Sequence, residues 1–412
     1  MGDLKAGPVR LRVLAGTPVY YDAPLYRRLA ADPRLDFTAI FASSEGAGAF
    51  DPGFGRPVDF GIDPLGGYQS VFLRRAHSVS VAARGGTESS PFALRDPDVV
   101  RVLLRERPEV LWIQGYNFVT HALAAATQRL RRRPLLWREV QTTLDSRPMW
   151  KRTLKAVGLR VLFGGCRGLY IGTENRRWLE SFGVPPERLF FTPFVVDNES
   201  LRRQADELVP HRAALRQKLG IAPDATVVLT VGRLIAKKQP QLLLDAFARV
   251  RRVRPCTLLF VGTGQLESAL RERVRRESIP DVVFAGFRPQ TEIAAMYAVA
   301  DIFALVSCFQ ETWGAVVNEA MNFGLPVVVT DKVGSATDLV QDGRNGYVVG
   351  SRDVEGLARR LEALVGSAEL RVQLGRQSAE IVRGWTYERA AEGVVAAVAA
   401  AVGADRWARA AA

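Results

Sequence analysis

Two glutamates, Glu311 and Glu319, flank seven residues between one apolar run and the start of another. Residues 301–307 are apolar enough for a strand buried on both faces, so Glu311 is expected in the loop at its carboxyl end. Residues 315–322 predict a helix that ends at Gly324 and carries Glu319. Carboxylates accept hydrogen bonds from sugar hydroxyls, and amides at a helix N-terminus suit a diphosphate. The pair indicates a nucleotide-sugar site, although such a pair standing alone would more often be accidental.

A basic loop follows a second buried run. Gly232, Arg233 and Lys238 come after the apolar residues 226–231 and before the helical run 241–250. A nucleoside diphosphate gains negative charge as it leaves a sugar, and Arg233 and Lys238 carry the charge to stabilise it. A solvated basic loop is the alternative, and for this run alone it is the commoner outcome.

Two glycine turns follow further predicted strands. Gly262 and Gly264 form a Gly-x-Gly turn, and Phe287 and Arg288 follow a glycine at the end of the next strand. The first turn suits phosphate approach, and the second offers backbone groups to a base. Plain connections between strands and helices also explain both turns, and for the second turn a plain connection is the commoner outcome, so each is a weak signal by itself.

Strand-like apolar runs alternate with helical patterns along the whole chain. The runs lie at 11–15, 37–41, 110–114, 134–137, 169–171, 189–191, 226–231, 257–261, 282–284, 301–307 and 326–330. This alternation predicts an α/β protein with two Rossmann-like, doubly wound parallel sheets. Sites in such sheets form outside the carboxyl ends of the strands, so we expect the two domains to face a central cleft.

The polar stretch between the two groups of strands predicts the domain boundary near residues 195–212. We therefore expect an acceptor-binding domain at 1–200, a donor-binding domain at 201–385 and a C-terminal helix at 386–412. The last helix is free to pack back on the N-terminal domain. Gly and Pro are frequent over residues 46–67, which predicts an irregular excursion.

The composition describes a globular chain with an excess of positive charge. The 412 residues are 48% hydrophobic and carry a formal charge of +13. No apolar run reaches the roughly 20 residues of a membrane span, and the N-terminus lacks a secretory pattern, so we expect a cytoplasmic protein. The three cysteines, Cys166, Cys256 and Cys308, show no metal-ligand spacing. We expect reduced thiols.

The charge of +13 favours acidic partners. No nucleic-acid-binding module is present, so nucleic acid is not expected. Contact with an anionic membrane at the inner face of the plasma membrane, where a lipid-linked acceptor would lie, is one interpretation. A solvated, arginine-rich surface is the other.

The order of these motifs resembles the retaining glycosyltransferases of family 4, also called group 1 glycosyltransferases, which share the GT-B architecture. The resemblance is densest over residues 226–350. It implies that Arg233 and Lys238 contact the donor diphosphate. It also implies that Glu311 contacts sugar hydroxyls and that Glu319 holds the ribose. A nucleoside diphosphate sugar would be the donor, with no cofactor and no metal.

The resemblance further implies a set of donor-binding residues. They are Gly16, Gly232, Gly262, Gly264, Phe287, Arg288, Thr312, Trp313, Gly314, Ala315 and Glu319. Gly16 stands alone where the family often has two glycines after its first strand.

Three residues of the first half are candidates for contacts with the acceptor or the donor sugar. Arg138 and Glu139 follow a predicted strand where many family members carry a histidine. His121 follows another strand, from which its side chain can face the cleft, although a position on a helix surface is favoured.

Residues 149–161 predict a helix with a narrow apolar stripe. Trp150, Leu154, Val157 and Val161 share one face, with cations beside it. Contact with a membrane and packing into the core both explain such a stripe, and core packing is the expectation.

These observations predict a retaining transfer of a sugar to an acceptor hydroxyl in polysaccharide, lipid-linked glycan or natural-product synthesis. A nucleotide-sugar epimerase or a sugar phosphorylase shares the architecture. A non-catalytic, donor-binding subunit of a glycosyltransferase complex is the alternative from another class.

Overall fold

The computed structural model describes residues 7–44, 50–51, 56–57, 63–76, 95–115, 119–140, 149–309 and 311–411. The chain divides into two compact units. Unit 1 contains the described residues up to Pro193 together with the C-terminal segment from Tyr387, and unit 2 contains Phe194–Thr386. Most of the predicted excursion at 46–67 lies outside the described residues.

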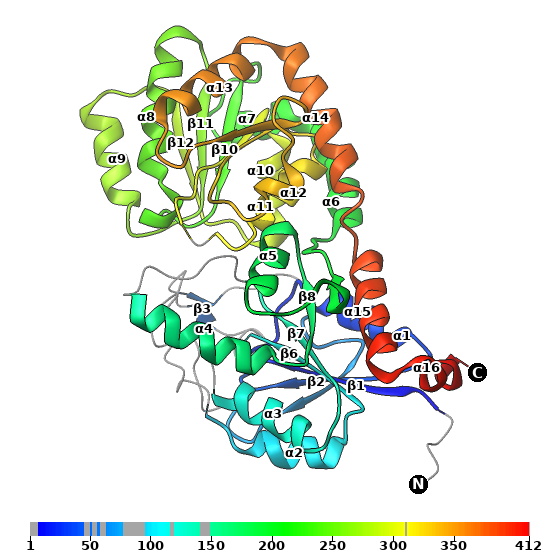
Figure 1. Cartoon of the computed structure of the whole chain (residues 1–412). Coiled ribbons are helices and arrows are strands. Elements are labelled where there is room, and N and C mark those ends of the chain that lie inside the picture. The colour runs from blue at the N-terminus through cyan, green and yellow to red at the C-terminus, as the bar shows by residue number, and fades with distance from the viewer. Residues whose placement is uncertain are drawn as a thin grey trace. The chain divides into compact units, whose positions relative to one another are not determined.

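Unit 1 is built on a parallel sheet of seven strands in the order β5-β2-β1-β6-β7-β8-β9 (Figure 1). The strands are β1 (Val9–Ala15), β2 (Leu35–Phe41), β5 (Gln69–Phe72), β6 (Val110–Gln114), β7 (Leu135–Arg138), β8 (Arg167–Tyr170) and β9 (Leu189–Phe191). β3 (Phe50–Asp51) and β4 (Arg56–Pro57) form a separate antiparallel pair. The helices are α1 (Ala23–Ala31), α2 (Asp98–Glu106), α3 (Val119–Leu130), α4 (Met149–Phe163), α5 (Thr173–Ser181), the 3-10 turn η1 (Pro186–Arg188), α15 (Tyr387–Val402) and α16 (Ala404–Ala411).

Unit 2 is built on a parallel sheet of six strands in the order β12-β11-β10-β13-β14-β15. The strands are β10 (Val227–Val231), β11 (Thr257–Val261), β12 (Val282–Gly286), β13 (Ile302–Leu305), β14 (Val327–Thr330) and β15 (Gly346–Val349). The helices are α6 (Asn198–Leu208), α7 (Arg212–Lys218), α8 (Pro240–Val253), α9 (Glu267–Arg276), α10 (Gln290–Ala298), α11 (Ala315–Asn322), α12 (Ala336–Leu339), α13 (Val354–Gly366) and α14 (Ala368–Val382), with the 3-10 turns η2 (Val209–His211) and η3 (Ala236–Lys238).

Both sheets have the strand order of a doubly wound fold, which confirms the predicted fold class. The chain starts in the middle of each sheet, moves to one edge and then returns to build the other half. The order reverses between β1 and β6 in unit 1 and between β10 and β13 in unit 2. Ligands of such sheets bind at this reversal, outside the carboxyl ends of the strands.

Every apolar run of the sequence that predicted a strand forms one, whereas β5, β15 and the two-residue strands β3 and β4 were missed. β5 is an edge strand with half of its residues exposed, and β15 begins with a glycine. Neither has the long apolar run that identifies a strand buried on both faces.

The cores of the two units lie on both faces of each sheet. In unit 1, Trp137 packs with Phe163 of α4, their ring centroids 5.3 Å apart, and Phe163 packs with Trp178 of α5 at 5.7 Å. On the other face, Tyr26 of α1 meets Trp112 at 6.0 Å. Burying each such ring contributes about 1.5–3 kcal/mol, so these helices hold the strand ends in fixed positions.

In unit 2, the helices α8, α9 and α13 cover one face, where their leucines pack on alternate residues of the central strands. On the opposite face, Tyr297 of α10 packs with Phe303 of β13, their ring centroids 6.1 Å apart. The alternation follows from the pleat of a strand, in which successive side chains point to opposite faces.

The C-terminal helices pack on unit 1. The Tyr387 hydroxyl donates to the Tyr21 carbonyl over 3.0 Å, and Arg167 donates to the Ala400 carbonyl over 2.6 Å. Gly393 of α15 lies so close to β9 that a Cβ there would be 1.9 Å from the Phe191 carbonyl oxygen.

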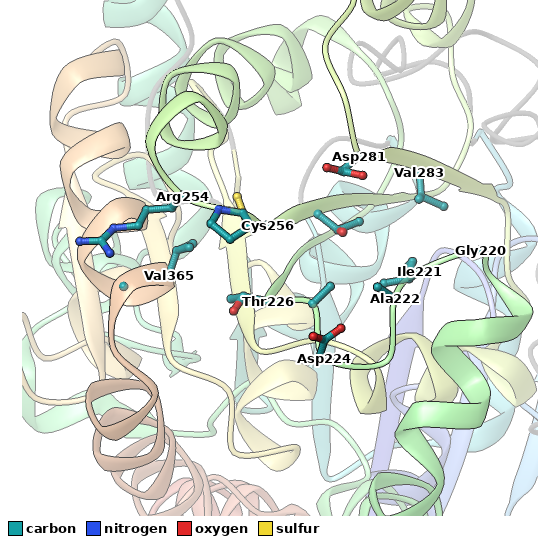
Figure 2. Close-up of a pocket in the computed structure, with 14 residues that line it drawn as sticks. Gly220, Ile221, Ala222, Asp224, Thr226, Arg254, Cys256, Asp281, Val283 and Val365 are labelled. Carbon is teal, nitrogen blue, oxygen red and sulfur yellow. The ribbon is translucent and has the colours of Figure 1, made fainter.

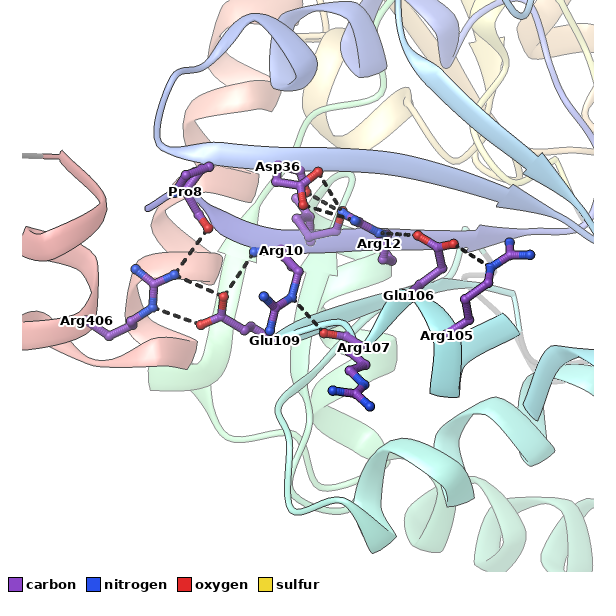
Figure 3. Close-up of polar contacts among 10 residues, drawn as sticks. Pro8, Arg10, Arg12, Asp36, Arg105, Glu106, Arg107, Glu109 and Arg406 are labelled. Carbon is purple, nitrogen blue, oxygen red and sulfur yellow. Dashed lines mark hydrogen bonds and ion pairs between the residues drawn. The ribbon is translucent and has the colours of Figure 1, made fainter. Parts of the chain in front are cut away.

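A buried ion pair fastens α16 to the sheet of unit 1 (Figure 3). Arg406 donates from Nε and Nη2 to the two carboxylate oxygens of Glu109 over 2.8 and 3.0 Å. It also donates to the carbonyls of Gly7 and Pro8, and the Arg10 amide donates to Glu109. Because this arrangement is bidentate and buried, it fixes the helix in both position and orientation.

The expectation that the apolar stripe of α4 packs into the core is wrong. Leu159 and Phe163 are the residues of α4 that enter the core. The four stripe residues are exposed, with fractions of 66% for Trp150, 69% for Leu154, 52% for Val157 and 71% for Val161. The helix is therefore apolar on two faces, and the sheet covers the one that carries Leu159 and Phe163.

Candidate functional site

The basic loop after β10 lies against the end of β13, at the reversal point of the sheet in unit 2. The Cys308 amide donates to the Lys237 carbonyl over 2.9 Å. The Gln239 side chain donates to the Val306 carbonyl over 2.8 Å and to the Ser351 carbonyl over 2.6 Å. These bonds hold η3, and with it Lys238, beside the loop that carries Glu311.

Lys238 and Glu311 form an ion pair at this point. The Lys238 ammonium donates to Oε2 of Glu311, and the Ser307 hydroxyl donates to the same oxygen over 2.8 Å. No described residue donates to Oε1 of Glu311. Burial raises the pKa of Glu311, but the charges of Lys238 and Lys237 and the two hydrogen bonds outweigh it, so the net shift is downward. Glu311 is thus an ionised acceptor with one oxygen left for a ligand.

The loop that carries Glu311 leads directly into α11 through a left-handed glycine. Gly314 has a φ of 89°, and a Cβ there would lie 2.9 Å from Leu305 Cδ2. Gly334 also has no room for a side chain, since a Cβ there would lie 2.1 Å from the Thr312 carbonyl oxygen. The Gly334 amide donates to the Glu311 carbonyl over 2.8 Å. The two glycines let neighbouring loops close on each other, which presents the first amides of α11 beside Glu311.

Glu319 projects from α11 into a buried polar contact. The Tyr297 hydroxyl donates to its Oε2 over 2.6 Å. Burial raises the pKa of Glu319, and the hydrogen bonds from Tyr297 and Gln290 offset this only in part. Glu311 and Glu319 therefore have pKa values shifted in opposite directions, although only the loop end and the first turn of α11 separate them in the chain.

The Gly-x-Gly turn after β11 packs against the loop after β10. A Cβ at Gly262 would lie 2.1 Å from the Gly232 carbonyl oxygen, and one at Gly264 would lie 2.4 Å from the Leu234 carbonyl oxygen. The Leu234 amide donates to the Thr263 carbonyl over 2.9 Å. Both glycines are explained by this close backbone approach, which sets the path of the loop that carries Arg233.

Two arginines near the site each have a buried nitrogen that donates no hydrogen bond to the described residues. The Nε atoms of Arg233 and Arg288 are buried and have no hydrogen-bond partner among the described residues. Arg288 also pairs with Glu292 on the next helical turn, at 3.2 Å. Phe287 and Arg288 follow the end of β12. Buried donors of this kind are costly unless a ligand or water meets them.

Trp313 is a core residue. Its side chain is buried, its Nε1 donates to Asn318 over 2.8 Å, and its ring packs with Phe194 at 6.0 Å and Trp385 at 5.0 Å. Its side chain therefore supports the loop from beneath. Thr312 contributes the carbonyl against which Gly334 packs, and Ala315 is the first residue of α11.

The reversal point of unit 1 also gathers charged residues. Gly16 follows β1, and its carbonyl accepts from the Ser43 amide over 2.8 Å. Further along that loop, Asp22 pairs with Arg138 from the end of β7 at 2.9 Å. Both side chains are only 7% exposed. A buried pair of this kind joins two strand ends rigidly.

His121, in the first turn of α3, and Glu139, just after β7, both lie close to Gly115, which follows β6. A Cβ at Gly115 would be 3.5 Å from His121 Cε1 and 4.0 Å from Glu139 Oε2. The preference for a helix-surface His121 is wrong, because the residue is 1% exposed. Burial lowers the pKa of His121 to about 4, so the ring is neutral at pH 7. The Glu139 carbonyl accepts from Asn175 over 2.6 Å.

The sequence interpretation missed Ser307, Asp22 and Tyr297. Ser307 ends an apolar run, and a polar residue at that position was an available signal. Asp22 and Tyr297 reach their partners over separations of 116 and 22 residues, and no local pattern connects them.

A separate pocket lies at the other end of the strands in unit 2, away from their carboxyl ends (Figure 2). Its lining includes Thr226, Thr257 and Asp281, each at or beside the amino end of β10, β11 or β12. Doubly wound sheets bind their ligands at the carboxyl ends, so this pocket is no part of the candidate site.

Solved structures share the fold of this chain. Anabaena Alr3699/HepE in complex with UDP and glucose matches with a TM-score of 0.67 at 17% identity, over 95% of this chain and all (100%) of that one. The apo form of the lipopolysaccharide outer core galactosyltransferase WaaB matches with a TM-score of 0.68 at 14% identity, over 95% of this chain and 99% of the other. The fold is therefore a GT-B α/β fold, built from two parallel-sheet units.

Sequence comparison adds a family match in the second half of the chain. Residues 211–380 match the family model of the glycosyl transferases group 1, and this range contains Arg233, Lys238, Glu311 and Glu319. The D-inositol 3-phosphate glycosyltransferase of Nocardia farcinica is 30% identical over 238 residues, which is 56% of this chain and 51% of the relative. The spore coat protein SA of Bacillus subtilis is 30% identical over 198 residues, 45% of this chain and 51% of the relative. The chain thus spans about half the length of these curated relatives.

Proposed function

We propose that this chain is a retaining, metal-independent glycosyltransferase that moves a sugar from a nucleoside diphosphate to an acceptor hydroxyl. The observation that carries the proposal is the pair of Lys238 and Glu311 at the reversal point of unit 2, beside the start of α11. A cation for the diphosphate, an ionised carboxylate for sugar hydroxyls and helix amides for phosphate meet there. The match to the glycosyl transferases group 1 covers the same residues.

In the proposed reaction, the bond between the anomeric carbon and the diphosphate oxygen breaks as the acceptor oxygen bonds to that carbon on the same face. The leaving phosphate oxygen accepts the acceptor's proton. Arg233 and Lys238 stabilise the charge that develops on the diphosphate, and Glu311 orients the sugar through its hydroxyls. Preorganised groups of this kind each contribute about 10²–10³ in rate.

The donor and acceptor are proposed by class. HepE was solved with UDP and with UDP-glucose, so a uridine nucleotide is the first donor to test. A hydroxyl on a glycan, on a lipid-linked saccharide or on a small molecule such as an inositol phosphate is the acceptor class. Peripheral contact with an anionic membrane on the cytoplasmic side belongs to the same proposal.

Thermal unfolding with UDP, GDP, ADP and dTDP, each at saturation, tests the donor site. A ligand at 100 times its dissociation constant adds about 2.7 kcal/mol of stability, so one nucleotide should raise Tm by several degrees. No shift with any of the four would contradict the assignment of the site.

Release of the nucleoside diphosphate from its sugar by the purified chain then tests catalysis. We expect slow donor hydrolysis that continues in excess EDTA. Loss of hydrolysis in EDTA would contradict metal independence, and donor binding without turnover would favour a non-catalytic subunit. Conversion of the donor without an acceptor into another nucleotide sugar would identify an epimerase, and dependence on phosphate would identify a phosphorylase.

A further inference from the structure

Trp313 lies between the two ends of unit 2. The chain enters this unit through residues 194–198 and leaves it through residues 382–386, which we call the entry and exit segments. The Trp313 ring packs with Phe194, their centroids 6.0 Å and their planes 24° apart, and with Trp385, at 5.0 Å between centroids. Trp313 is 2% exposed. One buried ring in the loop before α11 therefore holds both segments.

Hydrogen bonds join the same two segments to α11. Asn322 of α11 donates from Nδ2 to Oδ1 of Asn198 over 2.7 Å. Asn198 in turn donates to the carbonyls of Trp385 and Val382 over 2.8 and 3.1 Å. Both asparagines are buried, and α11 packs against α6 and α14 (Figure 1). Asn198 thus connects the entry segment, the exit segment and α11.

The ring contacts and the hydrogen bonds meet at the start of α11. Trp313 donates from Nε1 to Oδ1 of Asn318 over 2.8 Å, and Asn322 donates to the Asn318 carbonyl over 2.9 Å. The Trp313 carbonyl accepts from the Ser335 amide over 2.9 Å. Close-packed interiors transmit displacements instead of absorbing them. A shift of the loop that carries Glu311 therefore reaches both segments.

This network keeps polar groups in reserve. Asn318 Nδ2, Asn322 Oδ1 and the Ser335 hydroxyl are buried and have no hydrogen-bond partner among the described residues. Such groups are costly, and an apolar core of the same shape would avoid the cost. Unused donors and acceptors let the network exchange partners when the loop moves. It can then hold two arrangements, which coupling between distant sites requires.

We propose that Trp313 is a positioning residue that couples the loop of Glu311 to the entry and exit segments, so that a nucleotide bound at the start of α11 fixes the packing of both. This coupling rests on the proposed function, because it needs the donor site at Glu311. Linkage makes it reciprocal, so loosening the exit segment at Trp385 weakens nucleotide binding by the same factor. Couplings between sites are typically about 5–150-fold.

Amide hydrogen exchange of the full chain, measured without ligand and with saturating UDP, tests the coupling. We expect protection at 311–318 and a slowing of exchange by about fivefold or more in the entry and exit segments. The amides of Asn198 and Trp385, which donate to the carbonyls of Val196 and Val382, report on the two segments. GDP, ADP or dTDP replaces UDP as the probe where it is the nucleotide that raises Tm.

The pattern of protection separates this coupling from the proposed function. Protection at 311–318 with unchanged exchange in both segments would overturn the coupling and leave the proposed function standing. Protection at neither place would contradict the donor site and the coupling together. α7 serves as the reference region, because its Arg216 pairs with Asp301 at the amino end of β13, where exchange should not change.

Variants test the reverse direction. Trp385→Leu should weaken nucleotide binding by about fivefold or more, because it removes a ring that packs on Trp313. Trp385→Phe keeps a ring in place and should retain most of the affinity. The control Leu361→Ala removes buried volume from a core cluster that contains no residue of the network, so it should lower Tm without weakening binding. Calorimetric titration, well below the Tm of every variant, measures the affinities.

Equal affinity of Trp385→Leu and the wild type would overturn the coupling. So would a loss of affinity in Leu361→Ala as large as in Trp385→Leu, because lowered stability would then explain both. The exchange measurement uses the unaltered chain, so it decides the question even if Trp385→Leu does not fold.

Discussion

The two glutamates of the candidate site differ in their environments, and this difference carries the residue-scale predictions. Glu311 faces two lysines and a hydroxyl, which keep it ionised. Burial raises the pKa of Glu319, and the hydrogen bond from Tyr297 offsets this rise only in part. One carboxylate is prepared to accept from a ligand, and the other is held in a buried hydrogen bond with Tyr297.

Glu311→Gln should reduce transfer or donor hydrolysis by about 10²-fold or more, because a neutral amide is a weaker acceptor for sugar hydroxyls and leaves Lys238 unpaired. Single-turnover rates with a saturating donor measure the effect, and circular dichroism verifies the fold. The exposed Glu362→Gln serves as the matched control. A turnover rate within threefold of the wild type would remove Glu311 from the proposed mechanism.

Glu319→Gln should separate stability from donor binding. A raised pKa means that the folded state holds a proton that the unfolded chain releases, so wild-type stability falls as pH rises from 4.5 towards the folded pKa of Glu319. The glutamine variant lacks this loss while still accepting from Tyr297. Its Tm relative to the wild type should therefore increase between pH 5 and pH 8 in thermal scans.

The same Glu319→Gln variant should bind the nucleotide more weakly if Glu319 holds the ribose. Calorimetric titration with the nucleotide that shifts Tm measures this. Unchanged affinity together with the expected rise in Tm would make Glu319 a purely structural residue.

Glycines determine how the loops of the site fit together at the scale of elements. Gly262 has a φ of 127°, and any Cβ there meets the Gly232 carbonyl at 2.1 Å. Only backbone movement relieves that contact, since no flexible side chain is involved. The loops after β10 and β11 are thus packed as one piece, and the position of Arg233 depends on it.

Gly262→Ala should destabilise the chain by at least about 1–3 kcal/mol and weaken nucleotide binding, because the two loops must separate. Urea unfolding and nucleotide titration measure the two effects. Gly158→Ala is the control, since nothing lies within 4 Å of its Cβ and alanine favours a helix by up to about 1 kcal/mol. Equal stability of Gly262→Ala and the wild type would show that the loops tolerate separation.

At the scale of the whole molecule, the chain returns to its first unit after completing its second. α15 packs on α1 and on strands β6 to β9, all far earlier in the chain, and α16 packs on α15. The buried pair of Arg406 and Glu109 secures this return. Unit 1 is therefore complete only when the C-terminal segment is in place.

Arg406→Leu should cost about 3–5 kcal/mol, because it leaves Glu109 charged and buried without its partner. Burial raises the pKa of Glu109, but Arg406 and Arg10 outweigh it and lower the net pKa. The stability from this pair is present above pH 4.5 and is lost as pH falls through the folded pKa of Glu109, so wild type and variant should converge in acid. Thermal scans across pH measure this.

Two further variants test whether the loss of stability comes from the buried ion pair. The exposed Arg409→Leu on the same helix should leave Tm nearly unchanged. Glu109→Leu/Arg406→Leu should recover part of the stability lost in Arg406→Leu, because it removes the unpaired charge. A single variant as stable as the wild type at pH 7 would show that α16 docks without the pair.

The sequence by itself determined most strands of the two sheets and their order along the chain. Long apolar runs identify buried parallel strands, and their alternation with helical patterns allows few topologies. The same local rules predicted a helix at 315–322 and its end at Gly324, where the structure has α11 and a left-handed glycine. Each of these features follows from neighbouring residues, which a sequence displays directly.

The tertiary structure alone decided which side chains meet. Lys238 and Glu311 are 73 residues apart, and Arg406 and Glu109 are 297 apart. His121 is buried and the apolar stripe of α4 is exposed, both against the sequence prediction, because an amphipathic pattern shows that a face is apolar without showing what covers it. Partners, burial and pKa shifts depend on distances in space between elements, and no local pattern in the sequence records those distances.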